Sequence, residues 1–195
     1  MRPDINKIKE HDPKLIGYED ILKAAVLIPL IEDEILFEVR STDIPDQPGD
    51  ICLPGGMIEP GESPMEAAVR ETCEELLIPE SSIEILGQAD YYHTANIVIF
   101  PFAGSLNDYK YTFSRDEVSE VFTVPVEFFM NEEPEIYEVS SQIMPDEDFP
   151  YHLIQGGRNY KWRRTKVIEM FYRYESHIIW GMTARIINAF IESLK

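Results

Sequence analysis

Basic residues, cysteines and long apolar runs are all scarce in this chain of 195 residues. Its 17 lysines and arginines face 36 aspartates and glutamates, and the resulting net charge of −19 repels a nucleic-acid backbone. Two cysteines are too few for a disulfide scaffold and indicate reduced thiols in the cytoplasm. No apolar run reaches the roughly 18 residues of a membrane span, and the N-terminus lacks the apolar core of a signal peptide. We therefore expect no nucleic-acid partner, no membrane span and a cytoplasmic location.

The rest of the composition is that of a globular protein. Apolar residues make up 44% and charged residues 27% of the chain, which excludes wholesale disorder. A chain of this length buries roughly 70% of its unfolded surface, enough for a core, and it is short for two domains. We therefore predict one domain over residues 1–195. The charge does not exclude phosphorylated small molecules, because bound metal ions reverse its local sign.

Apolar alternation and turn-forming residues predict strands, loops and helices in turn. Residues 131–150 hold seven acids, no base and three prolines, so we expect an exposed loop or subdomain there. Apolar residues at helical spacing predict a packed amphipathic helix over 183–194. The other expected elements are a short helix and loop over 3–23, two strands over 24–40 with a turn near Glu32, a loop over 41–56, strands within 83–105 and 111–126, and a hairpin turn at 155–158.

The best-specified element is a helix over residues 63–77. Ser63 is a good N-cap, Pro64 suits the first helical position, and Glu66 completes a capping box. At about 100° per residue, one side of this helix is predicted to face the core. The residues on that side are Met65, Ala68, Val69, Thr72, Cys73 and Leu76.

Three acids of the same helix, Glu71, Glu74 and Glu75, lie outside that face and repel one another. Each like-charge pair at this spacing costs about 0.2–0.5 kcal/mol, and the helix C-terminus disfavours anions. One interpretation is a solvated acidic face. The other is a site for a hard cation such as Mg²⁺ or Mn²⁺, which takes oxygen ligands. The residues before the helix distinguish the two interpretations.

Paired glycines, Gly55 and Gly56, precede the helix and allow a sharp turn and a close approach to a ligand or metal. The charged residues follow at fixed intervals. The order is Gly56, five residues, Glu62, seven residues, Arg70-Glu71, two residues and Glu74-Glu75. This spacing resembles the Nudix box, G-x5-E-x7-R-E-U-x-E-E-x-G-U, over residues 56–78, where U is a bulky aliphatic residue.

Two positions depart from the Nudix pattern. Thr72 stands at the first aliphatic position, which is a small change on the core side of the helix. Leu77 stands where glycine is usual and removes a residue suited to a left-handed helix end. Ile78 matches the final aliphatic position.

The resemblance implies a fold and a metal-dependent activity. Nudix proteins are α/β proteins with an α/β/α sandwich and a mixed β-sheet, and most cleave a nucleoside diphosphate linked to another group. On this resemblance, Glu71, Glu74 and Glu75 bind Mg²⁺ or Mn²⁺ and act in catalysis, and the Gly56 carbonyl is a further metal ligand.

The resemblance also assigns residues around the metal ligands. Glu62 and Arg70 would be structural, pairing to orient the loop and the glutamates. The general base varies in the superfamily, and many members recruit it from a distal loop. Glu117 and Glu120 are candidates for that role here, with loop solubility as the alternative.

A second likeness, to CoA pyrophosphatases, lies ahead of the box. Their motif is close to L-L-T-x-R-S-x3-R-x3-G-x3-F-P-G-G, and this chain has Arg40, Ser41 and Gly49 at the same spacing. The departures are Phe37, Glu38, Pro45 and Leu53, of which Pro45 replaces an arginine.

Residues 179–185, Ile-Trp-Gly-Met-Thr-Ala-Arg, resemble the I-W-G-x-T-A segment of the same group. The likeness implies cleavage of CoA or acyl-CoA to 3′,5′-ADP and (acyl-)4′-phosphopantetheine. Arg40, Ser41, Gly49 and Gly55 would help to bind this small-molecule substrate.

Several alternatives stay open at this point. Arg40 binds a substrate phosphate or forms a salt bridge at a strand end. The bases Arg158, Lys161, Arg163, Arg164 and Lys166 attract the 3′-phosphate of CoA or offset nearby acids on a surface strand. The rival functions are hydrolysis of another diphosphate, such as ADP-ribose or a nucleoside triphosphate, and ligand binding without turnover. A homodimer is a further expectation.

Overall fold

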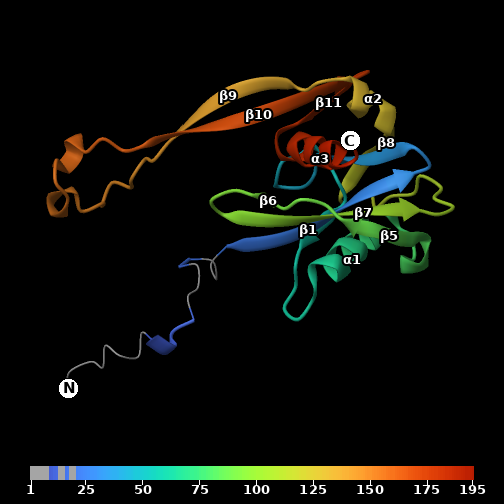
Figure 1. The fold of residues 1–195 in the computed structure, drawn as a ribbon, viewed down its shortest axis with the longest axis horizontal. Helices are drawn as coiled ribbons and strands as arrows, with labels where there is room; N and C mark the ends of the chain where they lie inside the picture. Colours follow the sequence, from blue (N-terminus) through green and yellow to red (C-terminus); the bar gives the residue numbers. More distant parts are fainter. Residues whose placement is uncertain (1–8, 13–15, 18–20) are drawn as a thin grey trace.

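The computed structural model describes residues 9–12, 16–17 and 21–195, so most of the helix and loop predicted over 3–23 lies outside the described residues. Within these ranges, eight strands form one sheet at the centre of the molecule (Figure 1). The strands are β1 Leu22–Ile31, β2 Glu34–Arg40, β3 Ile51–Cys52, β4 Gly55–Met57, β5 Ile83–Gln88, β6 Tyr92–His93, β7 Ile97–Leu106 and β8 Val118–Pro125.

The sheet is mixed, as predicted. Strands β1 and β7 are parallel, and the other pairs in this sheet are antiparallel. Strand β4 pairs with β1 so that Gly55 lies opposite Val26 and Gly56 lies opposite Ala25. The paired glycines therefore lie at the side of a central strand, where they are held in one position.

Two helices cover opposite faces of the sheet (Figure 1). Helix α1, Pro64–Leu76, closes one core with Leu27 and Leu36, and helix α3, Gly181–Ser193, closes the other with Ile28 and Phe37. Leu36 and Phe37 are neighbours on β2, and they enter different cores because side chains alternate along a strand. This arrangement confirms the α/β/α sandwich. The C-terminal helix begins two residues before the predicted 183–194.

The predicted strand pair over 24–40 is confirmed as β1 and β2, with the turn between Ile31 and Glu34. The predicted loop over 41–56 contains the short strand β3 and the first two residues of β4. A short 3₁₀ turn at Glu80–Ser82 leads into β5, and helix α2, Val126–Asn131, follows β8. No helix among the described residues is both long and apolar enough to cross a membrane.

A second, three-stranded sheet follows α2, so the exposed loop or subdomain predicted over 131–150 contains an exposed strand. This sheet consists of β9 Glu135–Gln142, β10 Arg164–Tyr174 and β11 His177–Trp180. The acids that suggested a loop pair across strands, with Glu138 Oε1 2.7 Å from Lys166 Nζ and Glu135 in contact with Arg173. Cross-strand pairing of this kind makes an acidic segment compatible with a strand.

Figure 1 shows β9 and the paired part of β10 extending away from the body as a two-stranded ribbon, which we call the arm (residues 135–174). The connection at its tip contains two short 3₁₀ turns, Tyr151–Leu153 and Gly157–Asn159. The predicted hairpin turn at 155–158 lies within this connection, which is longer than a simple hairpin turn. At its base the arm packs on α3 through Tyr172.

Candidate active site

Helix α1 begins as the sequence predicts. The Ser63 hydroxyl accepts a hydrogen bond from the Glu66 N–H at 3.3 Å, and the Glu66 carboxylate accepts one from the Ser63 N–H at 2.8 Å. These bonds confirm the capping box. The helix ends at Leu77, whose φ of 55° and ψ of 46° are left-handed. Leu77 thus adopts the conformation that suits the glycine of the Nudix box, with the steric strain of a side chain there.

The side of α1 that faces the sheet differs from the predicted one. Ala68, Thr72 and Leu76 are buried as expected. Met65, however, is 44% exposed, whereas Glu75 is only 6% exposed. The prediction placed Glu75 outside the core-facing side of the helix. Glu75 is nevertheless buried, because the helix packs on the glycines of β4, which leave room for a carboxylate between the helix and the sheet.

Gly55 and Gly56 form the wall against which two acids of α1 lie. The Gly55 N–H donates to Glu75 Oε2 at 2.8 Å. A Cβ atom on Gly56 would lie 2.4 Å from Glu71 Oε1, and one on Gly55 would lie 2.3 Å from the Ala25 carbonyl oxygen. Neither position has room for a side chain, so the backbone itself approaches both carboxylates.

Arg70 connects the loop to the helix. Its Nε lies 2.9 Å from Glu62 Oε1, and its Nη1 lies 2.8 Å from Glu71 Oε1. Its Nη2 donates to the Met57 carbonyl at 3.2 Å. The hydrogen bonds from Arg70 lower the pKa of Glu62. The pair therefore fixes the loop and one face of Glu71, which is the orienting arrangement that the Nudix resemblance implies for Glu62 and Arg70.

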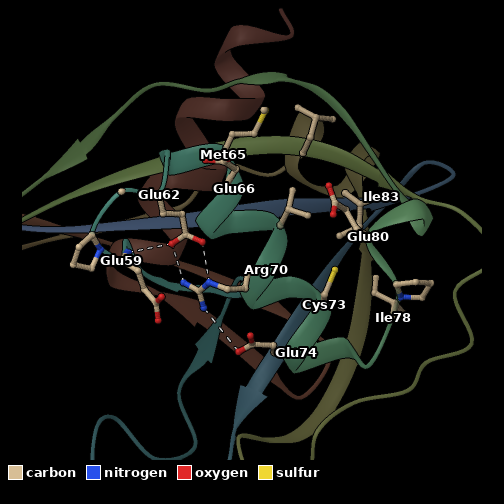
Figure 2. A pocket seen from close by; sticks show the side chains of 15 residues that line it. Glu59, Glu62, Met65, Glu66, Arg70, Cys73, Glu74, Ile78, Glu80 and Ile83 are labelled. Carbon is tan, nitrogen blue, oxygen red and sulfur yellow. Dashed lines mark hydrogen bonds and ion pairs between the residues drawn. The ribbon is translucent and has the colours of Figure 1, made fainter.

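Figure 2 shows Arg70 and Glu62 in an open pocket of about 800 Å³ beside α1. Glu74 also lines this pocket, with one carboxylate oxygen 3.9 Å from Arg70 Nη1. Glu71 and Glu75 are not among its lining residues. The three acids of the helix are thus divided, with Glu74 toward solvent and Glu75 between the helix and the sheet.

The donor set beside the glycines has the chemistry of a hard-cation site. Burial is the main cause that raises the pKa of Glu75 to about 8; the Gly55 N–H opposes the rise, and the charges of Glu71 and Glu117 add to it. A cation next to these carboxylates would relieve the repulsion. In the part of the chain that the structure describes, no three acid, histidine or cysteine side chains converge as a ready-made metal site.

The two distal candidates for the base have different surroundings. Glu117 precedes β8, its carbonyl accepts from the Ser41 N–H at 2.8 Å, and its charge acts on Glu75. Glu120 lies farther along β8, where its Oε1 is 3.1 Å from His177 Nε2. Glu117 therefore lies near the helix carboxylates, whereas Glu120 forms a pair with a histidine.

The loop between β2 and β3 is closed by backbone hydrogen bonds. The Gly49 N–H donates to the Arg40 carbonyl at 3.1 Å, and the Arg40 N–H donates to the Asp50 carbonyl at 2.9 Å. The Arg40 Nε donates a hydrogen bond to the Asp46 carbonyl. The positive charge of Arg40 lowers the pKa of Glu75. Arg40 forms no salt bridge in the described residues, so the strand-end ion pair considered above is absent there.

The two segments that resemble CoA pyrophosphatases meet in space. Thr183 Oγ1 donates to the Ile51 carbonyl at 3.1 Å across 132 positions of the chain. A cavity of about 220 Å³ is lined by Arg40, Trp180 and Thr183, among others. A second cavity of about 540 Å³ contains Gly49 and Trp180. The two cavities share lining residues at the start of β3.

Glu38 is a site residue that sequence reasoning missed, apart from noting it as a departure from the CoA motif. Its side chain is 1% exposed on β2, and its Oε1 has no hydrogen-bond partner. Burial holds its pKa well above the ordinary value, and the charges of Glu75 and Glu117 add to this rise. The available signal was an acid inside the apolar run Ile35–Val39.

The two tryptophans lie at opposite ends of the arm. Arg158 lies 4.9 Å over the Tyr151 ring at the arm tip. Trp162 packs edge-on against two aromatic rings at the same tip. Trp180 stacks on Phe171 at the base of the arm and lines both cavities described above.

Comparison with known proteins adds to this geometry. The family model described as the NUDIX domain matches residues 21–155. The chain belongs to the Nudix family. A Nudix hydrolase of Photorhabdus laumondii named NudL is 30% identical over 178 residues, which cover 88% of this Nudix chain and 84% of that protein.

Two animal relatives of this Nudix chain are also similar. The peroxisomal coenzyme A diphosphatase NUDT7 of Mus musculus is 29% identical over 171 residues, which cover 84% of the chain and 66% of that protein. Nudix hydrolase 3 of Caenorhabditis elegans is 34% identical over 126 residues, or 59% of the chain. The chain spans about half, 52%, of the length of the worm protein.

Proposed function

We propose that this Nudix chain is a metal-dependent pyrophosphohydrolase that cleaves CoA or acyl-CoA to 3′,5′-ADP and (acyl-)4′-phosphopantetheine. The observation that carries the proposal is the meeting of the Arg40 loop with the Trp180–Thr183 segment, close to Glu75. These are the two segments that resemble CoA pyrophosphatases. The similarity to a protein named as a coenzyme A diphosphatase supports the same substrate class.

The reaction is an attack of water on a phosphoric anhydride. The water oxygen joins one phosphorus, the bond from that phosphorus to the bridging oxygen breaks, and the bridging oxygen leaves on the other phosphate. Mg²⁺ or Mn²⁺, held by Glu71, Glu74, Glu75 and the Gly56 carbonyl, would screen the phosphate oxygens and lower the pKa of a bound water.

The chain's own residues have three tasks in this proposal. Glu117 accepts the proton of the attacking water, because it is the distal acid that lies near Glu75. Arg70 holds Glu71 in place. Arg40 binds a substrate phosphate with its guanidinium, and Ser41 and Gly49 shape the loop around it.

The test is a product assay by mass spectrometry with CoA, acyl-CoAs, ADP-ribose and nucleoside triphosphates, each with Mg²⁺ or Mn²⁺. We expect CoA or an acyl-CoA to give 3′,5′-ADP and the pantetheine phosphate. Equal turnover of ADP-ribose would instead favour the broader diphosphate hydrolase. Binding of CoA without products would favour a ligand-binding module.

A variant tests the substrate contact directly. A charge-assisted phosphate contact contributes about 1.5–3 kcal/mol, so Arg40→Ala should lower kcat/KM for CoA by about ten- to a hundredfold. Lys110→Ala, an exposed base before β8, serves as the control and should keep the wild-type rate. Mn²⁺ affinity should change less than kcat/KM in Arg40→Ala. An unchanged rate in this variant would remove Arg40 from the substrate site.

A further inference from the structure

Glu38 is an unusual residue for the interior of a protein. It lies on β2, is 1% exposed, and is paired in register with Cys52 of β3 and Val121 of β8. Its Oε1 is one of two buried side-chain atoms in the described residues that lack a hydrogen-bond partner. Buried carboxylates are normally paired, hydrogen-bonded or bound to a metal. Packing alone does not account for this one.

The side chain points to the same face of the sheet as α1. Leu36, two residues earlier on β2, belongs to the core beneath α1, and side chains two apart share a face. Glu75 is buried on the α1 side of that space, and its charge acts on Glu38. The charge of Arg40 attracts Glu38 less strongly than the charge of either Glu75 or Glu117 repels it.

Three polar groups around Glu38 and Glu75 have other partners. The Tyr109 hydroxyl donates to the Thr112 carbonyl. The Arg40 Nε is bonded to the Asp46 carbonyl. The Gly55 N–H is bonded to Glu75. Two buried carboxyl groups thus lie between α1 and the sheet with no hydrogen bond between them, and the charge of Arg40, which acts on both, does not offset their repulsion.

We propose that Glu38 is a ligand for a divalent cation that it shares with Glu75, in addition to the ligands that the Nudix box supplies. This inference rests on the metal dependence proposed above. The CoA pyrophosphatase motif has threonine at this position, which offers no carboxylate, so the chain would carry one ligand more than that motif provides.

The experiment measures Mn²⁺ binding without turnover, by the loss of the free Mn²⁺ EPR signal, in wild type, Glu38→Gln and Glu38→Thr. Loss of a carboxylate ligand should weaken Mn²⁺ binding by at least about tenfold at one site. Glu84→Gln, which removes an exposed acid on β5, should bind as wild type does. Thermal unfolding in EDTA gives a second readout. Without metal, both Glu38 variants should melt at or above the wild-type temperature, because a buried unpaired acid has been removed.

The outcomes separate this inference from the proposed function. If Glu75→Gln loses Mn²⁺ binding and both Glu38 variants retain it, Glu38 is no ligand and the metal-dependent hydrolase stands. If the Glu38 variants melt lower than wild type by the same amount in EDTA and in Mn²⁺, Glu38 is a structural residue and the inference is wrong. If wild type binds no Mn²⁺, both proposals fail.

The arm supports a second, independent inference. Its strands expose large apolar side chains on both faces, with Ile136 60%, Tyr137 52% and Val139 50% exposed. The connection at the tip adds Met144 at 86% and Leu153 at 73%. A two-stranded ribbon is marginally stable by itself in water, and exposed apolar patches of this kind mark contact surfaces.

The charge distribution along the chain favours a second copy of the chain as the partner of the arm. Residues 158–166 hold five bases and no acid in a chain of net charge −19, so the remainder of the chain is strongly acidic. A second copy of this chain offers that acidic surface to the basic tip. We infer that the arm contacts a second copy of the chain and that the protein is a homodimer.

Light scattering during size-exclusion chromatography tests this inference at low and high salt. Wild type should have the mass of a dimer. Val139→Lys, on the arm, and Arg163→Glu with Arg164→Glu, at its tip, should have the mass of a monomer. Leu86→Lys replaces an equally exposed apolar residue, 58% exposed on β5, and should remain a dimer. A monomeric wild type, or a dimer that survives both arm variants, overturns the inference.

Discussion

The body around α1 and the arm use the same residue types in opposite surroundings. In the body, Glu71 and Glu75 lie against a glycine wall, and Glu75 is almost completely buried. On the arm, Glu135 and Glu138 lie on exposed strands and pair with bases of the neighbouring strand. Water screens the charge of a carboxylate on the arm, so its replacement should cost little stability. A buried carboxylate in the body depends on specific partners for its charge.

The largest expected effect comes from the buried carboxylate. Glu75→Gln keeps the shape and removes a proposed metal ligand, so kcat should fall by at least about 10²-fold, or about 2.7 kcal/mol of transition-state stabilisation. Glu138→Gln on the arm is the matched control and should keep the rate. Steady-state kinetics on the substrate identified by mass would compare the two. A Glu75→Gln enzyme with wild-type kcat would remove Glu75 from the catalytic site.

The two distal acids give the next comparison. Glu117→Gln should lower kcat by about 10²-fold, the lower range for a general base, because Glu117 lies near Glu75. Glu120→Gln should remain within about twofold of wild type, because surface substitutions of this kind rarely have larger effects and its partner is His177. Their pH–rate profiles would be measured together. Equal, near-wild-type rates for both variants would return the role of base to the helix glutamates.

In metal-free protein, the contributions of Glu75 in the body and Glu135 on the arm to folding stability should change with pH in opposite directions. The folded-state pKa of Glu75 is raised to about 8 from an unfolded value of 4.5, so the folded state holds the extra proton between these values. Its contribution to stability is therefore present below pH 4.5 and lost as the pH rises through 8. The hydrogen bond from Arg173 lowers the pKa of Glu135, so the pair stabilises the folded state above the unfolded-state pKa. This contribution is lost as the pH falls through the lower folded-state pKa.

Thermal unfolding in EDTA checks both signs, for Glu75 between pH 4.5 and 8 and for Glu135 below pH 4.5. Wild type should lose stability relative to Glu75→Gln as the pH rises. Glu135→Gln should differ from wild type less at acid pH than at neutral pH. Parallel curves for wild type and Glu75→Gln would show that Glu75 does not retain a proton in the folded state.

The comparison also explains what could be predicted from the sequence. The capping box and the strand pair over 24–40 follow from local signals that agree with their packing, whereas the sandwich was implied by the resemblance to the Nudix box. The strand β9 within the predicted loop or subdomain was not foreseen, because its acids Glu138 and Glu135 pair with bases 28 and 38 positions away, which no local pattern contains.

Two features of the site escaped prediction for a related reason. The burial of Glu75 depends on how closely α1 approaches β4, whereas helical periodicity places this acid outside the core-facing side of the helix. Glu38 interrupts an apolar run, and its position under α1 becomes visible only when the sheet is assembled. In both cases the sequence does not reveal how closely α1 packs on the sheet.

The smallest expected effect lies at the end of α1. Leu77 is left-handed and 60% exposed, so its side chain contributes strain and little packing. Leu77→Gly removes Cβ strain of about 1–2 kcal/mol and adds backbone entropy to the unfolded chain, so a net gain of about 0.5–1 kcal/mol is expected. For a chain of this length, that gain raises Tm by about 1–4 °C. Glu175→Gly serves as the control, because Glu175 has a φ of 51° in the turn between β10 and β11, and it should raise Tm similarly. If Leu77→Gly lowers Tm while Glu175→Gly raises it, the Leu77 side chain makes a stabilising contact that outweighs its strain.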